Sequence, residues 1–576
     1  MAEKCGRNFT MAQLTCHSRQ EHWLYRQERK ALLSMTLQER ADKWHLRQAG
    51  LHSAHRYFHA VLSRFTITLK QKSYHQYLFL NNSSQCWNLF CQKVIGYLQV
   101  LLVIWGNKSM SYGGFKLNTI SKHPSKIMKS AKFLFLLLVI PILFGCEEKH
   151  DQAGLDKFSQ SQLIVWNRHL SEIIIRDIFT PPVASRIYSY PNIAAYEALA
   201  PAYPAYESLV NQYNGLSAIP QPDTTKEMYL PVSSIIAFST VGKKLILDEL
   251  KMEEYEAEYL GQLKQIGIRE EVLENSIAYG RQVGEHILEW AKKDGYIETR
   301  ALTRHVISAK PDTWQPTAPD YMPAIEPHWN KMRPFVMDSA AHYTPKLPTA
   351  FDSSATSDFY REAMETYTIV KNLDEEKQLI ARFWDDNPNI SHTKGHVTYF
   401  QQKLTPPGHW VSITSSAIRK NNLDMMEAAE TYVMVTTALS DGFISCWDAK
   451  FKYNTIRPDT YIERYIDPDW DPILQTPPFP EFPSGHSVIS AAAATVLTHK
   501  FGDSYAFVDS TQLAIGLPVR KFNSFNEAAY EVGESRIYGG IHFRPACDLG
   551  AEQGKAVGNH IVAKLRTRKA AQTAKL

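Results

Sequence analysis

The sequence predicts an all-α protein from about residue 155 onward. Apolar residues recur there about every 3.6 positions, which is the period of an amphipathic helix. Strand signals are few, and Pro-rich loops at 310–348 and 467–483 separate the apolar stretches. A hydrophobic fraction of 44% and a charged fraction of 21% are ordinary for a globular chain. One all-α domain, or two helical halves around a shared core, fits this pattern.

The helical pattern begins with Leu163 and continues through Ile175. No stretch after Cys146 reaches the length of about 20 apolar residues that spans a bilayer. A helical chain of this size can bury a large core. Later apolar stretches predict further helices at 228–256, 272–293, 359–384, 424–449, 487–501 and 548–566.

The first 146 residues differ in composition from the rest of the chain. The 576 residues carry a formal net charge of +4, yet no Asp or Glu occurs from residue 43 to Cys146. A soluble domain of that length normally contains carboxylates. Without this part the chain is acidic, so the small positive charge does not indicate nucleic-acid binding.

A segment organised like a signal peptide begins at Met128. Its positively charged start ends at Lys132, an apolar run extends from Phe133 to Phe144, and Cys146 follows. The run is too short to span a bilayer and fits the apolar core of a signal peptide. The Cys directly after it indicates bacterial lipoprotein processing, with lipid on Cys146. A buried apolar helix or a simple anchor is the alternative.

A signal peptide cannot act 127 residues into a chain. We therefore expect translation to start at Met128, so that 1–127 is a non-native upstream extension, disordered or poorly structured. Residues 128–145 are then the lipoprotein signal peptide, and 146–576 form the all-α domain, whose motifs fall in 440–550. The predicted location is the periplasm, outer membrane or cell surface of a bacterium. A genuine basic N-terminal arm is the alternative.

Cysteine use fits this division of the chain. Of seven Cys, only Cys446 and Cys547 lie in the main body. Two Cys make neither a disulfide framework nor a Cys-based metal site. We expect both to be buried as small apolar residues.

Lys450 and Arg457 form the first of three polar clusters. They are seven residues apart, which on one helix is about two turns, so both side chains would share a face. Pro458 disfavours the helical conformation at Arg457, so the helix is expected to end there. Two cations at a helix end suit a polyanion; a solvated basic face is the alternative.

The second cluster is Ser484-Gly485-His486, which precedes a strongly helical run from Ser487. Free backbone N–H groups at a helix start bind anions. Gly485 allows close backbone approach, and the Ser484 hydroxyl is a further donor. His486 can carry protons beside the anion. A simple helix N-cap with an incidental His is the alternative.

The third cluster contains Arg536 and His542. The Arg536 guanidinium offers a planar fork to an oxyanion, and Gly539-Gly540 breaks the chain so that both side chains can turn inward. An imidazole is a good metal ligand or nucleophile, although a lone His is more often part of a core or loop. The three clusters together predict one oxyanion site with three cations and two histidines.

These clusters resemble the signature of the vanadium-dependent haloperoxidases, which share a superfamily with type 2 phosphatidic acid phosphatases and bacterial acid phosphatases. The shared pattern is Lys-x6-Arg-Pro, then Pro-Ser-Gly-His, then Ser-Arg-x5-His, and all three parts are complete here. Trp447 and Phe479 match the bacterial chloroperoxidase-like branch. Trp384-Asp385 resembles the segment whose Asp supports the second Arg. The resemblance spans roughly 155–565 and implies helical bundles of the haloperoxidase and acid phosphatase type.

The resemblance implies a vanadate cofactor, with vanadium as V5+, and hydrogen peroxide and halide as substrates. Iodide or bromide would be oxidised to hypohalous acid, which can react with a small organic acceptor. His542 would coordinate vanadium, His486 would exchange protons, and Asp385 would orient Arg536. Lys450 and Arg536 would act with the two histidines in catalysis, and Trp447 and Phe479 would surround the site. The residues that would contact the vanadate oxygens are Lys450, Arg457, Ser484, Gly485, His486 and Arg536.

One departure concerns what orients His542. Many family members have an Asp four residues after the ligand His, whereas here Ala546 stands there and Asp548 comes six residues after. Four residues are about one helical turn and six point elsewhere. The sequence therefore does not say which group supports the ring of His542.

Two other functions fit the same clusters. A phosphatase could use His542 as nucleophile and His486 as leaving-group acid, because vanadate mimics the transition state of phosphoryl transfer. A lipoprotein that binds phosphate or vanadate without catalysis is a third reading. The haloperoxidase is the leading hypothesis because Trp447 and Phe479 accompany the three clusters.

Overall fold

The computed structural model describes residues 151–569 except positions 348, 389, 395 and 401. All of these residues belong to one unit of the chain, 132–576. The predicted upstream extension, the signal peptide and Cys146 lie outside the described residues, so those expectations stay predictions.

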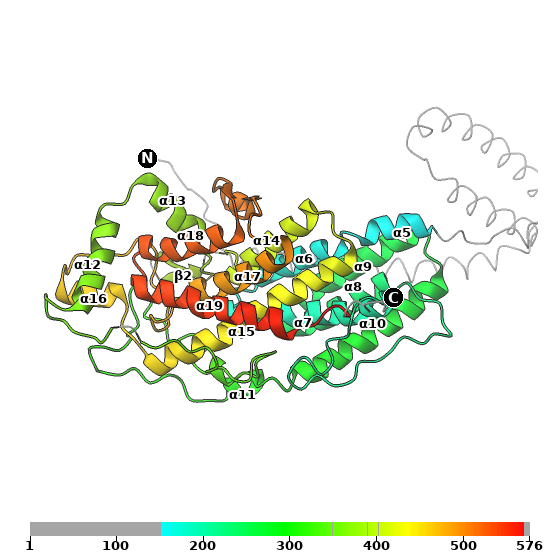
Figure 1. The fold of residues 1–576 in the computed structure, drawn as a ribbon, viewed down its shortest axis with the longest axis horizontal. Helices are drawn as coiled ribbons and strands as arrows, with labels where there is room; N and C mark the ends of the chain where they lie inside the picture. Colours follow the sequence, from blue (N-terminus) through cyan, green and yellow to red (C-terminus); the bar gives the residue numbers. More distant parts are fainter. Residues whose placement is uncertain (1–150, 348, 389, 395, 401, 570–576) are drawn as a thin grey trace, which may run out of the picture. The chain divides into compact units, whose positions relative to one another are not determined.

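Helices dominate the described residues (Figure 1), which confirms the all-α prediction. The α-helices are α5 (Gln152–Ser159), α6 (Gln162–Arg176), α7 (Pro181–Leu199), α8 (Leu230–Leu245), α9 (Glu249–Ile266), α10 (Glu270–Ala291), α11 (Tyr296–Arg300), α12 (Asp358–Lys371), α13 (Glu375–Phe383), α14 (Pro406–Lys420), α15 (Met425–Tyr453), α16 (Pro458–Tyr465), α17 (Gly485–Phe501), α18 (Phe525–Tyr538) and α19 (Arg544–Lys564). The 3-10 helices are η2 (Ala200–Ala202), η3 (Trp329–Lys331) and η4 (Thr511–Ile515). Strands β1 (Ser391–Lys394) and β2 (Val397–Phe400) pair antiparallel, as do β3 (Phe507–Asp509) and β4 (Arg520–Phe522).

Two predicted helices are each divided in the structure. The stretch 228–256 forms α8 and the start of α9, and the stretch 359–384 forms α12 and α13. The breaks fall at Asp248 and Asp374, whose carboxylates accept backbone N–H groups and cap α9 and α13. An apolar period can continue across such a break because both helices face one core.

Among the helices that the sequence analysis did not predict are α7, α14, α16 and α18. α7 is buried along its whole length, so it has no polar face from which a helical period could be detected. α14 begins with Pro406-Pro407, a pair that resembles a loop but is favourable in the first turn of a helix. Helix starts of this kind are easily taken for irregular segments.

α15 brings Lys450 to the site but does not carry Arg457. A reciprocal capping box between Asp424 and Glu427 begins this helix of 29 residues, and Asn454 ends it in the left-handed conformation with φ 52°. Lys450 therefore lies in the last turn, whereas Arg457 is extended and precedes α16. The expectation that both cations share one helix face was wrong, because the helix ends before Arg457 instead of at it.

α17 and α19 lie side by side, with α15 also against α17 (Figure 1). A Cβ on Gly550 would lie 3.1 Å from the Ser484 carbonyl oxygen, and one on Gly554 would lie 1.9 Å from the Val488 carbonyl oxygen. Only glycine permits this approach of the two backbones. Gly550 and then Gly554 of α19 contact successive turns of α17 in the same order along both helices. The two helices therefore run parallel, and their N-terminal ends lie together.

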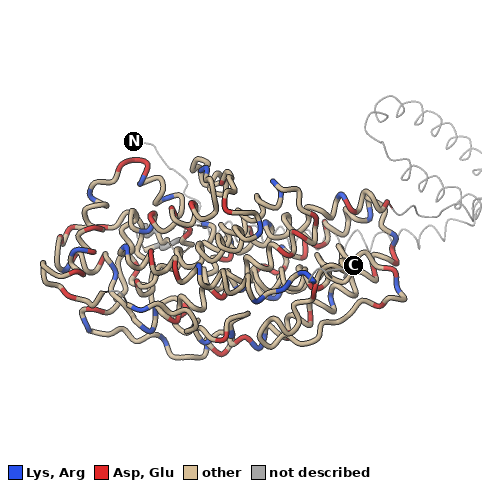
Figure 2. Tube along the Cα trace, viewed as in Figure 1, with Lys and Arg blue, Asp and Glu red and all other residues tan. Residues whose placement is uncertain are grey.

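One cluster of buried apolar side chains extends from Leu155 to Leu565. A smaller cluster that contains Phe359 and Phe543 lies beside it. Acidic and basic positions are interspersed along the described trace (Figure 2). Among the helices of residues 151–569, none is both long and apolar enough to cross a membrane.

Candidate active site

The three polar clusters converge where α15 ends and where α17 and α19 begin. Lys450 comes from α15, the Ser-Gly-His segment opens α17, and His542 immediately precedes α19. Lys450, Arg457, Ser484, Gly485, Arg536 and His542 are buried, and His486 is half-buried. The structure thus brings together residues that are up to 92 positions apart in the sequence.

A small cavity of about 20 Å³ lies at this junction. It is lined by His486, His542 and the backbone of Gly485, and its other walls are apolar. This space suits a small inorganic group and is far below the several hundred Å³ of a typical organic-ligand site. The apolar walls are Pro181, Pro406, Phe443, Trp447, Pro477, Phe479 and Ile541.

Lys450 is completely buried beside the cavity. Its Nζ donates to the carbonyl oxygens of Pro480 at 2.8 Å and Glu481 at 3.0 Å, and lies 5.0 Å from the Phe479 ring centroid. Burial, together with the charge of Arg457, lowers the pKa of Lys450 to about 7. A nearby anion would favour the charged form.

Arg457 has one unpartnered nitrogen. Its Nε donates to the Phe479 carbonyl at 3.0 Å, and its Nη1 donates to the Ile541 carbonyl at 2.7 Å and to His542 Nε2 at 3.2 Å. Within the described part of the chain, the buried Nη2 has no hydrogen-bond partner. Burial lowers the pKa of Arg457 to about 10, so the guanidinium stays charged at neutral pH.

The ring of His542 is fixed from both sides. Its Nδ1 lies 2.8 Å from Glu481 Oε1, which also accepts the Phe543 N–H at 3.1 Å. Arg457 can only donate, so Nε2 is an acceptor and the proton of the neutral ring resides on Nδ1. Burial, and then the charge of Arg457, lower the pKa of His542 well below its usual value. The Nε2 lone pair of the neutral ring accepts the Arg457 N–H in this structure, and a ligand at Nε2 would replace that bond.

Glu481 is the support of His542 that the sequence analysis missed. It is buried, and burial raises its pKa to about 7 against the opposing effect of Arg457 and Lys450. Asp548, by contrast, is exposed on α19. A signal was present in the sequence, because Glu481 is the one charged residue between Asp471 and His486.

Backbone carbonyls hold Arg536 in place. Its Nη2 donates to the carbonyl oxygens of Trp384 at 2.7 Å and Ala381 at 3.3 Å, and its Nε donates to Ser535 Oγ at 3.0 Å. The two carbonyls belong to the C-terminal end of α13 and to the residue after it. Burial lowers the pKa of Arg536.

Asp385 is placed differently from the expectation that it orients Arg536 directly. Its Oδ2 lies 2.8 Å from Lys403 Nζ in a buried ion pair. The hydrogen bonds of the Arg536 guanidinium in the described residues go to the carbonyls and hydroxyl named above. Asp385 acts on Arg536 through charge, since its carboxylate raises the pKa of Arg536 against the effect of burial.

The start of α17 combines an N-cap with a close backbone approach. Ser484 Oγ accepts the Ser487 N–H at 3.3 Å and the Ser487 hydroxyl at 3.0 Å, so Ser484 is a true N-cap. A Cβ on Gly485 would lie 3.4 Å from the Trp447 ring. The missing side chain therefore leaves the first backbone N–H groups of α17 accessible from the cavity.

His486 is poised to accept a proton. Its Nε2 is buried and, among the described residues, has no hydrogen-bond partner. Burial first, and then the charges of Arg536 and His409, lower the pKa of His486 well below its usual value. The ring is therefore neutral at physiological pH and has a basic nitrogen available.

The donor set fits an oxyanion. Three buried cations gather at this junction, and two buried polar atoms, Arg457 Nη2 and His486 Nε2, lack partners in the described chain. Buried polar groups without partners are costly and call for an explanation. No group of three or more His, Cys, Asp or Glu side chains in the described residues is arranged to hold a metal ion. An oxyanion, ligated at one His and hydrogen-bonded elsewhere, completes this arrangement.

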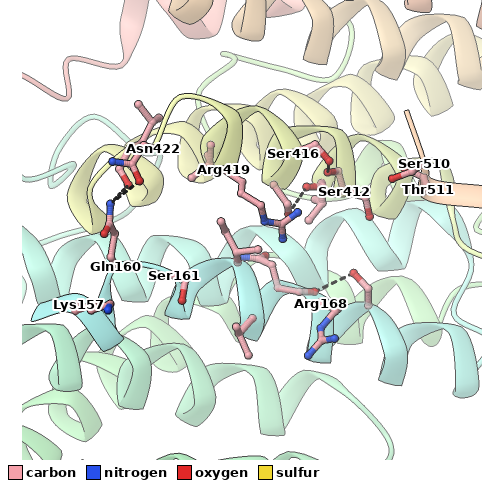
Figure 3. Close-up of a pocket in the computed structure, with 18 residues that line it drawn as sticks. Lys157, Gln160, Ser161, Arg168, Ser412, Ser416, Arg419, Asn422, Ser510 and Thr511 are labelled. Carbon is pink, nitrogen blue, oxygen red and sulfur yellow. Dashed lines mark hydrogen bonds between the residues drawn. The ribbon is translucent and has the colours of Figure 1, made fainter. Parts of the chain in front are cut away.

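A much larger cavity, of about 620 Å³, lies elsewhere, between α6 and α14 (Figure 3). We call it the surface groove. Lys157, Arg168 and Arg419 line it together with several hydroxyl groups and no carboxylate. All three cations are exposed, and the groove includes no residue of the three clusters.

Comparisons with known proteins identify relatives of this chain. A family model described as the VCPO second helical-bundle domain matches residues 430–569. A bacterial vanadium-dependent iodoperoxidase of known structure is 44% identical, with a TM-score of 0.68 over 71% of this chain and 97% of that chain. The holo and apo forms of a bacterial vanadium-dependent chloroperoxidase are 16% and 14% identical, with TM-scores of 0.50 and 0.52, over 67% of this chain and 93% and 94% of theirs. The comparison with curated proteins gave no match.

The buried cations, the helix N-terminus and the two histidines define an oxyanion-handling enzyme built from helical bundles. The 44% identity extends over nearly all of the iodoperoxidase chain, so this protein belongs to the vanadium-dependent haloperoxidase family and is an enzyme of that class. The likeness to the chloroperoxidase, at 16% identity, bears on the fold alone.

Proposed function

We propose that this haloperoxidase oxidises iodide, and less readily bromide, with vanadate held at the three clusters. Iodide, hydrogen peroxide and one proton give hypoiodous acid and water; iodide loses two electrons to the peroxide oxygens. The proposal is carried by the two unpartnered buried atoms, Arg457 Nη2 and His486 Nε2, beside three buried cations. An oxyanion supplies the partners that these groups lack.

The residues suit distinct roles toward vanadate. His542 would coordinate vanadium through Nε2, because Nδ1 is bound to Glu481. When bound, vanadate supplies an electrophilic centre that activates peroxide while vanadium stays V5+. In the low-dielectric site each cation contributes more than it would in water. The groups that would hold the oxygens are Lys450, Arg457, Arg536, the Ser484 hydroxyl and the Gly485 N–H.

His486 is the proton carrier in this proposal. Burial, and then the neighbouring cations, hold the pKa of His486 well below its usual value, so the ring is neutral and can take a proton from hydrogen peroxide at Nε2. A bound anion would partly neutralise those cations and raise the pKa of His486. The imidazolium then returns the proton to the leaving oxygen.

The apolar wall supports iodide as the preferred halide. The rings of Trp447 and Phe479 lie 5.1 Å apart at the cavity, and the Trp447 N–H is already bound to the Ile325 carbonyl at 3.2 Å. A large halide loses less hydration free energy on entering such surroundings than a small one. The 44% identical relative is an iodoperoxidase, and iodide is also the easiest halide to oxidise.

Two assays on the full chain test the proposal. After addition of orthovanadate, oxidation of iodide, bromide and chloride by hydrogen peroxide is measured, and we expect activity in that order. Hydrolysis of an aromatic phosphate without vanadate tests the phosphatase alternative. Vanadate retained without any halide oxidation would refute the proposal. In His542→Ala we expect vanadium to be lost on dialysis.

We also propose that the enzyme is an exported lipoprotein that begins at Met128 and carries lipid on Cys146. The charged start, the short apolar run and the following Cys support this proposal. Mass spectrometry of the native protein should find no peptides from 1–127 and a lipid-modified N-terminal Cys146. Peptides from 1–127 would contradict the proposed start, and unmodified protein from wild type and Cys146→Ser alike would contradict lipidation.

A further inference from the structure

His409 lies fully buried between two carboxylates, in the first turn of α14. Its Nδ1 is 2.9 Å from Asp386 Oδ2, and its Nε2 is 2.8 Å from Asp509 Oδ2. Both carboxylates are buried as well. No sequence motif indicates this triad, because Asp386 and Asp509 lie 23 and 100 positions from His409.

The geometry requires a charged imidazole. A neutral ring can donate from one nitrogen only, so its other nitrogen would face a carboxylate as acceptor against acceptor. Asp386 and Asp509 raise the pKa of His409 to about 10 although burial opposes them, and His409 holds the pKa of Asp509 below its usual value. The triad is thus an imidazolium between two carboxylates.

This triad fixes the chain directly after α13. Gln512 donates to Asp386 Oδ1 at 2.6 Å and to the Phe383 carbonyl at 3.0 Å. The Trp384 ring stacks on the His409 ring, with centroids 4.5 Å apart and planes 24° apart. The residues on both sides of Trp384 are therefore held by α14, β3 and η4.

The opposite side of Trp384 is tied to α18, the helix that carries Arg536. The Trp384 indole N–H donates to Glu531 Oε1 at 2.9 Å, and its carbonyl accepts Arg536 Nη2 at 2.7 Å. The imidazolium of His409 also lowers the pKa of His486. Two groups of the catalytic site thus depend on one buried charge that does not line the cavity.

We propose that His409, held between Asp386 and Asp509, is a positioning residue. It fixes the orientation of the Arg536 guanidinium through the Trp384 carbonyl. This inference rests on the proposed vanadate site. A triad that served stability alone would leave the direction of Arg536 unchanged when the triad is altered, provided that the fold survives.

His409→Gln is the central variant, because glutamine keeps one donor for a carboxylate but loses the charge and the stacked ring. Two uncompensated buried carboxylates can destabilise the fold. Asp509→Asn is therefore the second variant, since it keeps an oxygen acceptor while removing one charge. Arg419→Ala, in the surface groove at the other end of α14, is the matched control.

Vanadate binding is measured by equilibrium dialysis with vanadium quantified, and thermal unfolding is recorded without vanadate. We expect His409→Gln to weaken vanadate binding by about tenfold or more, as is typical for groups that support ligands indirectly, and Asp509→Asn by a smaller factor in the same direction. Arg419→Ala should match wild type. Folded triad variants with wild-type vanadate affinity and only a lower Tm would overturn the inference.

Crystal structures of wild type and the variants without vanadate give a readout that does not depend on the proposed function. We expect the Trp384 carbonyl and the Arg536 guanidinium to be displaced in the variants. Unchanged positions would refute the inference even if wild type binds vanadate. A wild type that fails to bind vanadate would refute the proposed function, and displaced Arg536 in the variants would still support the positioning role.

Discussion

Two regions of the molecule each gather three basic residues but differ in the burial of those residues. Lys450, Arg457 and Arg536 are buried around the cavity of about 20 Å³ without lining it, whereas the three cations that line the surface groove of about 620 Å³ are exposed. Burial shifts the pKa values of Lys450 and Arg457 to about 7 and about 10. Water screens the cations of the groove. Desolvation, and not cavity size, therefore distinguishes the catalytic site.

The comparison also explains why the unpartnered atoms are informative. An exposed cation such as Arg419 stays hydrated, so it carries no desolvation penalty. A buried Nη2 such as that of Arg457 has lost its water and found no replacement in the described chain. In the cavity, a bound oxyanion would replace the lost hydration and so offset the desolvation free energy. In the groove the cations are already hydrated, so a bound anion would stabilise them little.

Arg457→Ala should have the largest effect. It removes the unpartnered Nη2 and the bonds to two carbonyls and to His542, so we expect vanadate affinity to fall by about 10²-fold or more. Equilibrium dialysis measures the loss, and thermal unfolding without vanadate checks the fold. Arg457→Lys keeps the charge but loses the planar fork of the guanidinium. Its vanadate affinity should lie between those of wild type and Arg457→Ala. Wild-type affinity in both variants would mean that the cavity is not the vanadate site.

Glu481→Gln comes next. Glutamine can still accept the Nδ1–H of His542 but removes the negative charge that makes Nε2 more basic. We expect vanadate affinity to fall by about 10-fold to 100-fold, as measured by dialysis. Asp548→Asn is the matched control, because Asp548 is exposed, and it should behave as wild type. Weakened vanadate binding in Asp548→Asn, with wild-type binding in Glu481→Gln, would instead indicate that Asp548 supports His542.

Lys450 predicts a pH dependence of moderate size. Its pKa in the empty site is about 7, so raising the pH from about 6 to about 8 removes its charge and should lower vanadate affinity by about tenfold. Glu481, also with a pKa of about 7, titrates over the same interval and is present in both wild type and Lys450→Met, so the comparison of the two proteins isolates the effect of Lys450. Lys450→Met should bind weakly and show a flatter profile. Because vanadate's own ionisation is common to both proteins, parallel profiles would exclude this role for Lys450.

Changes in the surface groove should have the smallest effect. We expect Lys157→Ala and Arg419→Ala to alter vanadate affinity and iodide oxidation by less than about twofold, since these cations are exposed and screened. Dialysis and steady-state iodide oxidation are the measurements. A loss comparable to that of Arg457→Ala would show that burial does not separate the two regions.

Much of the site could be predicted because its residues recur in short, ordered motifs. Lys450, Arg457, Ser484 and Arg536 are buried near the junction where the two histidines line a cavity. The roles of Glu481 and His409 were not predicted, because they depend on partners 61 and 100 positions away. No local period or spacing encodes such a contact. The same limit applies to Asp385, whose partner is Lys403.

The sequence by itself determined the all-α class, the three clusters and the family signature, because helical periodicity and fixed motif spacing are local properties. Tertiary structure alone decided that Arg457 lies beyond the end of α15, that Glu481 supports His542, and that Arg536 binds backbone carbonyls. The physical reason is desolvation. Which charges lose their water, and which partners replace it, is settled only when distant segments pack together.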